Sequence, residues 1–78
     1  MIGWLNGKPI DTWQKGIKKF VLISCNSIGY EVQLLPRSHQ LINEQLDISL
    51  WIHQVYREEE IILFGFHEKS ERNFFRKL

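Results

Sequence analysis

The sequence has only one cysteine, Cys25, and no long hydrophobic run. A single cysteine cannot form an internal disulfide, which excludes the disulfide framework of a small secreted protein, and we expect Cys25 to be a buried, unreactive thiol. No apolar stretch is long enough to cross a bilayer, and the N-terminus lacks the basic and then apolar order of a signal peptide. We therefore expect a cytoplasmic protein without a membrane partner.

Familiar catalytic and metal-binding patterns are also missing. The three histidines, His39, His53 and His67, are separated by fourteen residues at each step, far from the compact spacing of metal ligands. The chain has no Gly-rich phosphate loop and no Ser/His/Asp grouping with motif support. We predict no metal site, no cofactor and no catalysis by this chain alone.

The 78 residues are 44% hydrophobic and 24% charged, a composition typical of one small folded domain, with or without the start of another. Residues 1–66 carry six Lys/Arg and seven Asp/Glu, a net charge of −1, whereas residues 67–78 carry four basic and two acidic side chains, a net charge of +2. A domain whose body grips nucleic acid is usually clearly basic. This body is slightly acidic.

Apolar periodicity predicts five strands. They cover residues 2–6, 20–24, 28–34, 47–56 and 61–66, and Pro9 would place a bulge or an edge in any strand that passes through it. Residues 37–43 fit a single helical turn, and residues 11–19 read as a polar, basic loop. From Glu68 onward the period becomes helical, with Phe74, Phe75 and Leu78 on one face that has too little partner in this chain.

This order predicts an all-β fold: a small OB-fold barrel, of Greek-key type, with five to six strands and one short helix. A small SH3-like barrel is the alternative, because periodicity alone does not separate the two. We expect residues 1–66 to form the barrel, and residues 67–78 to be the first helix of a second, helical domain.

The predicted last hairpin has an unusual tip. Arg57, Glu58, Glu59 and Glu60 read as a four-residue connection between its two strands, without Gly, Pro or Asn. Three consecutive carboxylates repel one another and gain nothing from packing. The tip is either an ordinary solvated turn or a negatively charged probe placed where it repels another anion.

A second candidate site lies in the predicted loop. Trp13 is followed by Lys15, Lys18 and Lys19, the combination of an aromatic ring and cations with which OB-folds bind single-stranded nucleic acid. A solvated loop without a ligand is the alternative. Trp4 and Trp51 are expected in the core or in an interface rather than as stacking platforms.

Several short motifs, in order, resemble one known family. The chain opens Met-Ile-Gly-x-Leu-x-Gly, continues with Gly29-Tyr30-Glu31-Val32, Arg57-Glu58-Glu59 and Leu63-Phe64-Gly65-Phe66, and ends with Glu71-Arg72-x-x-Phe75. No single motif is specific, but their order and spacing across nearly all of the chain resemble the N-terminal part of the RuvA family, the bacterial Holliday-junction-binding subunits of the branch-migration machinery.

The resemblance implies an OB-fold domain that assembles as a homotetramer and receives four-way junction DNA on one face. It further implies a helix-hairpin-helix second domain that holds the DNA arms, and partners in the RuvB ATPase and the RuvC resolvase through regions that this chain lacks. Glu58 and Glu59 match the acidic pin at the tetramer centre. In four copies, about eight carboxylates would surround one axis and repel the phosphates of a closed crossover.

The resemblance assigns no definite role to several other charged positions. Arg57, beside the pin, is expected either to contact DNA or to pair with a neighbouring acid, and Glu60 adds a third carboxylate. The segment 12–19 is longer and more basic than the family pattern, which assigns it no role, and Lys15, Lys18 and Lys19 remain possible DNA contacts. A stand-alone OB module for single-stranded nucleic acid is the alternative function. Nothing in the chain supplies the nucleotide site that an ATP-driven helicase needs.

Overall fold

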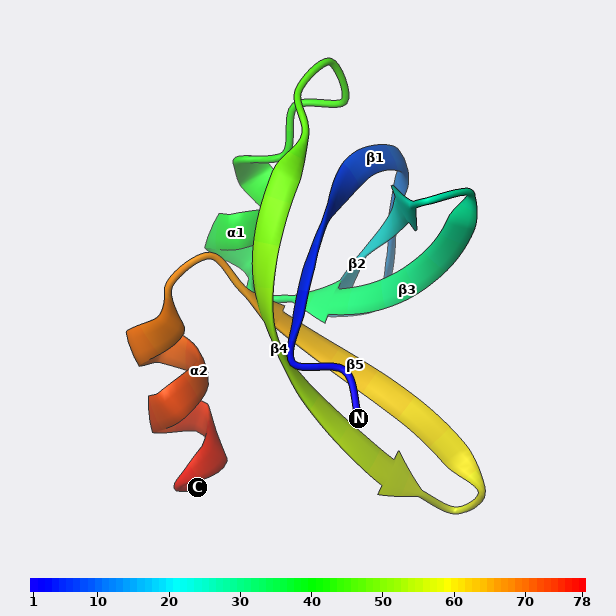
Figure 1. The fold of residues 1–78 in the computed structure, drawn as a ribbon. Helices are drawn as coiled ribbons and strands as arrows, with labels where there is room; N and C mark the ends of the chain where they lie inside the picture. The colour runs from blue at the N-terminus through cyan, green and yellow to red at the C-terminus, as the bar shows by residue number, and fades with distance from the viewer.

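The structure is a computed structural model that describes all 78 residues. It contains five strands and two short helices (Figure 1). In chain order these are β1 (Trp4–Lys15), β2 (Lys18–Cys25), β3 (Ile28–Leu34), α1 (Pro36–Gln40), β4 (Ile48–Arg57), β5 (Glu60–Phe66) and α2 (Lys69–Arg76). Neither helix is long and apolar enough to span a membrane.

The five strands form one closed barrel in the order β1-β2-β3-β5-β4. Neighbours are antiparallel except β3 and β5, which meet in a short parallel ladder at Gln33–Phe64 and Leu34–Gly65. Antiparallel pairing of β1 with β4 completes the closure. The predicted OB-fold barrel, with a short helix between the third and fourth strands, is confirmed.

Alternating residues of the strands fill the barrel. Its core consists of buried aliphatic side chains, namely Leu5, Val21, Ile23, Val32, Leu34, Leu50, Ile52 and Leu63. Gly65 lies among them, and a β-carbon there would come within 2.5 Å of Val32 Cγ1 and 3.3 Å of Leu50 Cδ1. The strands pack closely at this point because β5 offers no side chain.

The prediction of a basic loop over residues 11–19 is wrong. β1 continues to Lys15, β2 begins at Lys18, and Gly16 and Ile17 form the two-residue turn between them. Gly16 has φ +63°, which suits the first position of a type II′ hairpin turn. Sequence periodicity missed the strands because none of their residues is fully buried there, so no buried face imposes an alternation of apolar residues. The expected bulge is present as a register shift between Pro9 and Asp11.

Helix α2 packs against the outer face of the β4–β5 ladder (Figure 1). Phe75 is the anchor, with ring centroids 5.1 Å from both Phe64 and Phe66 and 5.5 Å from His53. The expectation that the apolar helix face lacks a partner is therefore wrong for Phe75, although Phe74 and Leu78 remain exposed.

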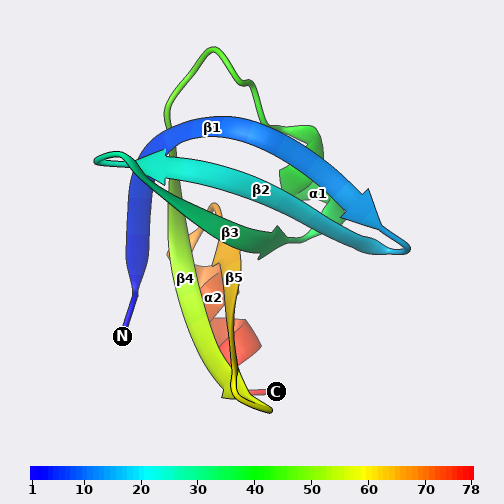
Figure 2. The same cartoon turned by 90° about the vertical axis from the view of Figure 1, so that its right-hand side faces the viewer.

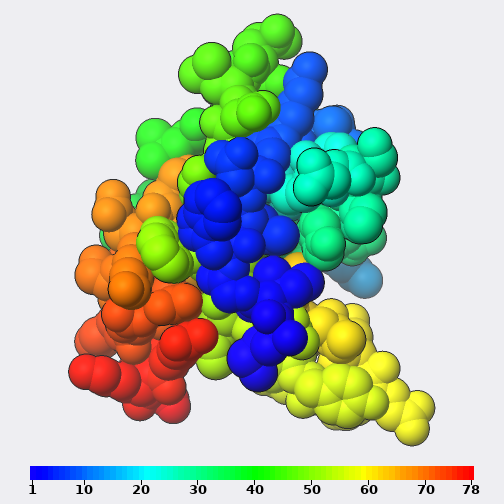
Figure 3. Space-filling model, viewed as in Figure 1, coloured from blue at the N-terminus to red at the C-terminus, as the bar shows by residue number.

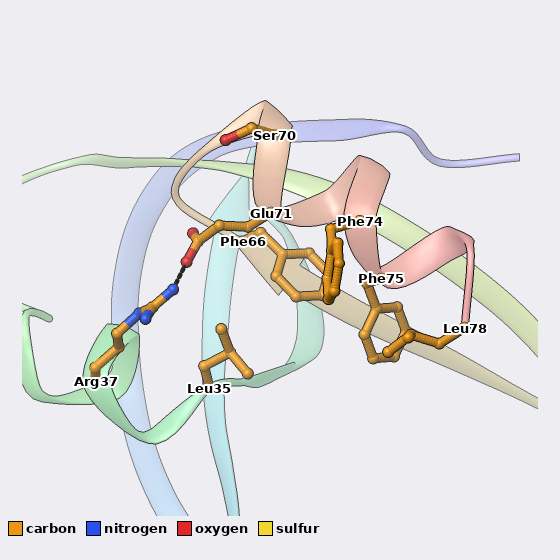
Figure 4. A pocket seen from close by; sticks show the side chains of 8 residues that line it. All are labelled: Leu35, Arg37, Phe66, Ser70, Glu71, Phe74, Phe75 and Leu78. Atoms are coloured by element: carbon orange, nitrogen blue, oxygen red, sulfur yellow. Dashed lines mark hydrogen bonds and ion pairs between the residues drawn. The ribbon is translucent and has the colours of Figure 1, made fainter.

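A shallow hollow of about 460 Å³ lies between α2 and the start of α1 (Figure 4). Its walls are mostly apolar, including Leu35, Phe66 and Phe75. Arg37 and Glu71 form an ion pair across one side, which ties the two helices together.

Candidate nucleic-acid interface

The β4–β5 hairpin projects beyond the body of the barrel (Figures 1 and 2). Its ladder continues without interruption from the Trp51–Phe66 pair to the Arg57–Glu60 pair. Tyr56 and Ile61 face each other near the tip and are 70% and 59% exposed. The outer half of this hairpin is therefore held by the ladder and cross-strand contacts rather than by the core.

The N-terminus fixes the hairpin where it leaves the barrel. The Ile2 N–H donates to Gln54 Oε1 at 2.8 Å, and the Ile52 N–H donates to the Gly3 carbonyl, also at 2.8 Å. Both bonds lie on β4, just beyond its ladder with β1. They support β4 at the base of the projection.

The predicted four-residue connection at the tip is wrong. Arg57 pairs with Glu60 in the ladder, so the turn consists of Glu58 and Glu59 alone. Their φ angles are +52° and +62°, the left-handed conformation that a type I′ hairpin turn requires at both central positions. Asn-Gly is the favoured pair there, because a residue with a β-carbon meets its own carbonyl in this conformation. Two glutamates occupy this turn at a cost in backbone strain.

The carboxylates at the tip face solvent without a partner. Glu58, Glu59 and Glu60 are exposed, and none of them takes part in an ion pair, since the only ion pair of the structure joins Arg37 and Glu71. Strain without compensating contacts is typical of functional sites rather than of structural turns. The tip thus combines a fixed backbone with a dense, unneutralised negative charge.

Arg57 does not neutralise this charge. It lies opposite Glu60 in the ladder, yet no carboxylate is within ion-pair distance of its guanidinium. Of the two expected roles for Arg57, pairing with a neighbouring acid is not found. Its exposed side chain keeps its hydrogen-bond donors available for a ligand.

The basic candidates lie elsewhere. Lys15 and Lys18 face each other beside the Gly16–Ile17 turn, at the tip of the β1–β2 hairpin, and Lys19 Nζ donates to Gln14 Oε1. Trp13 is stacked on Phe20 at 5.4 Å, so it belongs to a packed hairpin and not to a loose loop. Figure 2 shows this hairpin pointing in a different direction from the β4–β5 tip. The structure does not bring the lysines and the acidic turn together.

A further group of side chains was not singled out as a site by the sequence. Trp4 and Trp51 are ladder partners on the outer face of β1 and β4, and Lys69 and Arg72 of α2 lie over the Trp51 ring. Trp4 is half exposed and Trp51 is half-buried, so neither is a core residue, and the expected interface position stays a prediction. The Lys69–Arg72 spacing of three residues indicates one helix face, but the helix could not be placed over β4 from the sequence.

The remaining polar groups do not build a metal centre. No cluster of three His, Cys, Asp or Glu side chains has a geometry suited to an ion. His39 Nε2 and His67 Nδ1 are buried without a hydrogen-bond partner. Desolvation by burial raises the pKa of the Cys25 thiol, and a backbone hydrogen bond from Asn6 opposes the shift.

Comparison with known proteins identifies the family. Residues 1–65 match the family described as RuvA N terminal domain. The chain belongs to this family. It is 55% identical over 78 residues to the RuvA of Prochlorococcus marinus strain SARG, 51% to that of strain MIT 9211, and 42% to that of Synechococcus sp. strain WH7803.

Each of these three relatives is named Holliday junction branch migration complex subunit RuvA. The matches cover 100% of this chain but only 35–36% of each relative. The chain therefore spans about a third of the length of the curated relatives it matches. The resemblance to RuvA found in the sequence motifs is confirmed.

Proposed function

We propose that this chain is the barrel module of a RuvA protein and places the Glu58–Glu59 turn at the crossover of a four-way DNA junction. The observation that carries the proposal is the turn itself: two unpaired carboxylates in strained backbone conformations, at the tip of a projecting hairpin. The four-way junction as substrate is inferred from the relatives, which are named Holliday junction branch migration complex subunit RuvA.

In this proposal four copies assemble around one axis with their acidic turns at the centre. Two turn glutamates per chain give about eight negative charges near the axis. One carboxylate and one phosphate about 8 Å apart repel by about 0.5 kcal/mol in bulk water and about 2 kcal/mol at an effective dielectric constant of about 20. Salt screens this by a factor of about three at one Debye length. A stacked crossover or a continuous duplex brings phosphates to the axis and is disfavoured, whereas an open crossover is accommodated.

The proposal also includes a division into domains and a set of partners. Residues 1–66 form the barrel domain, and α2 begins the second, helix-hairpin-helix domain, which supplies most of the attraction for the DNA arms. The chain is a non-catalytic subunit that acts in the cytoplasm with the RuvB ATPase and the RuvC resolvase. This division explains how a slightly acidic barrel serves in a DNA-binding protein.

The test uses a chimera in which this chain replaces the matching residues of the full-length RuvA of Prochlorococcus marinus strain SARG. Sedimentation velocity first establishes that the chimera is a tetramer. Glu58→Gln with Glu59→Gln then removes the charge and keeps the side-chain size. We expect tighter binding to plain duplex and a fall of about tenfold in the junction-to-duplex affinity ratio at fixed salt, equivalent to about 1.4 kcal/mol.

A matched control removes the same charge elsewhere. Glu44→Gln with Asp47→Asn deletes two exposed carboxylates in the connection between α1 and β4. This variant should leave the affinity ratio unchanged. An unchanged ratio in the Glu58/Glu59 variant, or an equal fall in the control, contradicts the assigned role of the turn.

A stand-alone module for single-stranded nucleic acid, centred on Trp13 and Lys15, is the second candidate. The side-by-side lysines at the β1–β2 tip favour it, because neither Lys15 nor Lys18 has an anionic partner. Packing of Trp13 on Phe20 counts against it, since one face of the ring is already covered. Salt-dependent oligonucleotide binding that Trp13→Ala weakens would support this candidate.

A further inference from the structure

The outer face of the barrel carries a second exposed aromatic group, distinct from the acidic turn. Trp4 and Trp51 are paired in the β1–β4 ladder, with ring centroids 6.5 Å apart and a tilt of 58°. Their neighbours Leu5 and Leu50 point into the core, so both rings lie on the outside. Trp4 is 50% exposed, and one indole ring is thus available to a ligand.

Helix α2 places two cations over the second ring. Lys69 Nζ is 5.5 Å and the Arg72 guanidinium carbon 5.3 Å from the centre of the Trp51 ring. Figure 3 shows the start of β1, β4 and the first turn of α2 side by side on one face of the molecule. We call Trp4, Trp51, Lys69 and Arg72 the tryptophan patch.

No carboxylate neutralises these two cations. Glu71, the acid in the first turn of α2, forms an ion pair with Arg37 and accepts the Glu68 N–H. The Glu68 side chain in turn accepts the Glu71 backbone N–H in the capping box. Neither acid forms an ion pair with Lys69 or Arg72, so both cations of the patch lack a carboxylate within ion-pair distance.

Arg72 is the less usual member, because it is only 9% exposed. Its Nε and Nη2 donate to Asn73 Oδ1, a neutral amide oxygen, at 3.2 and 3.0 Å. A buried charge normally pairs with an opposite charge. Of the five N–H donors of a guanidinium, three remain free here. The site is therefore poised to receive an anion from outside the chain.

We propose that the tryptophan patch binds one unpaired strand of nucleic acid, with a backbone phosphate at Lys69 beside Arg72 and a base on Trp4. Exposed aromatic rings beside unpaired cations are the combination that holds single strands, since every base has a stacking face and every linkage a negative charge. An acidic protein segment would pair with the two cations but would not explain the exposed Trp4 ring. The inference rests on the proposed DNA-binding function and adds a contact for strands that leave the opened crossover.

The test reads each tryptophan separately. The chain has three tryptophans, and their indole N–H signals in a ¹⁵N–¹H NMR spectrum are assigned with single Trp→Phe variants. On titration of the 78-residue chain with a short oligothymidylate, we expect the Trp4 and Trp51 signals to move and the Trp13 signal to stay. Lys69→Gln should weaken the binding severalfold and lower the slope of log affinity against log salt by about 0.7.

Three further samples make the result decisive. Lys8→Gln, which removes an exposed lysine on β1, should bind like the parent chain apart from a small loss of general attraction. Trp4→Leu should weaken binding by about tenfold or more, because one stacked base is lost. Polyglutamate of matched charge should leave the Trp4 signal in place, and an equal shift with polyglutamate would overturn the assignment to nucleic acid.

The outcome separates this inference from the proposed function. Static Trp4 and Trp51 signals, together with a junction preference that depends on Glu58 and Glu59, would reject the tryptophan patch alone. Moving signals with an affinity that Lys69→Gln lowers severalfold, together with a junction preference independent of the acidic turn, would reject the role of the turn and keep the patch.

Discussion

The acidic turn should be less stable than the same hairpin with an ordinary turn sequence. Glu58 and Glu59 both have positive φ, a conformation that costs an ordinary residue roughly 1–2 kcal/mol. Glu58→Asn with Glu59→Gly installs the pair favoured in type I′ turns. Glycine also has more conformational entropy in the unfolded chain than glutamate, which lowers the expected gain in stability by roughly 0.5–1 kcal/mol. We expect the double variant to be more stable by about 1–2 kcal/mol.

The assay is urea unfolding followed by tryptophan fluorescence, with thermal unfolding as a second measurement. A domain of this size gains about 4–8 °C in Tm for each kcal/mol, so the expected rise is roughly 5–15 °C. Glu58→Gln with Glu59→Gln keeps both β-carbons, and hence the strain, while it removes the charge. Its free energy of unfolding should change by less than about 0.5 kcal/mol.

The two variants together separate strain from repulsion. If the Gln pair stabilises the chain as much as the Asn-Gly pair, charge repulsion and not backbone geometry limits the stability of the hairpin. If the Asn-Gly pair gives no gain, the turn is not strained and the reasoning fails. In the chimera the Asn-Gly variant should also lose junction preference, which would show that stability was given up for function.

Two further predictions concern the barrel. Gly65→Ala should destabilise it by about 1–3 kcal/mol through overpacking, because the new methyl group comes within 2.5 Å of Val32 Cγ1; Gly29→Ala, whose methyl group comes within 3.1 Å of the Leu22 side chain, should cost less in the same urea titration. The raised pKa of Cys25 should slow its alkylation by iodoacetamide relative to the urea-unfolded chain. Because the pKa of Cys25 is higher in the folded than in the unfolded chain, its contribution to the free energy of unfolding is complete below the unfolded pKa and is lost as pH rises through the folded pKa. Cys25→Ser should therefore lose less stability at alkaline pH than the parent chain. The same dependence of stability on pH in both proteins would contradict this prediction.

The sequence predicted the parts of the fold that are buried. Alternation at Ile28–Leu34 predicted one strand correctly, because the barrel core imposes a period of two. The apolar run at Phe20–Ile23 predicted a second, in which Val21 and Ile23 are buried and Phe20 and Leu22 are half-buried. The last residues of β1 and the first residues of β2 carry no such alternation, so the sequence predicts a loop there. The docking of Phe75 depends on long-range packing against β4 and β5, which no local pattern encodes.

The candidate site was foreseen in composition but not in geometry. The charge of the Glu58–Glu60 segment and its place in a hairpin were evident from the sequence, whereas the two-residue turn was not. Turn rules assign Asn or Gly to positive φ, and glutamates in those positions hid the tight turn. The tryptophan patch was missed because it joins β1, β4 and α2, three segments that only the closed barrel brings together.

The most direct test of the central claim is a charge series at the turn in the tetrameric chimera. The junction-to-duplex affinity ratio is measured at one salt concentration for the parent, for Glu58→Gln with Glu59→Gln, and for Glu58→Lys with Glu59→Lys. If the turn selects open junctions by repulsion, the ratio falls stepwise as its charge goes from negative through neutral to positive. A ratio that is the same for all three proteins would contradict the account.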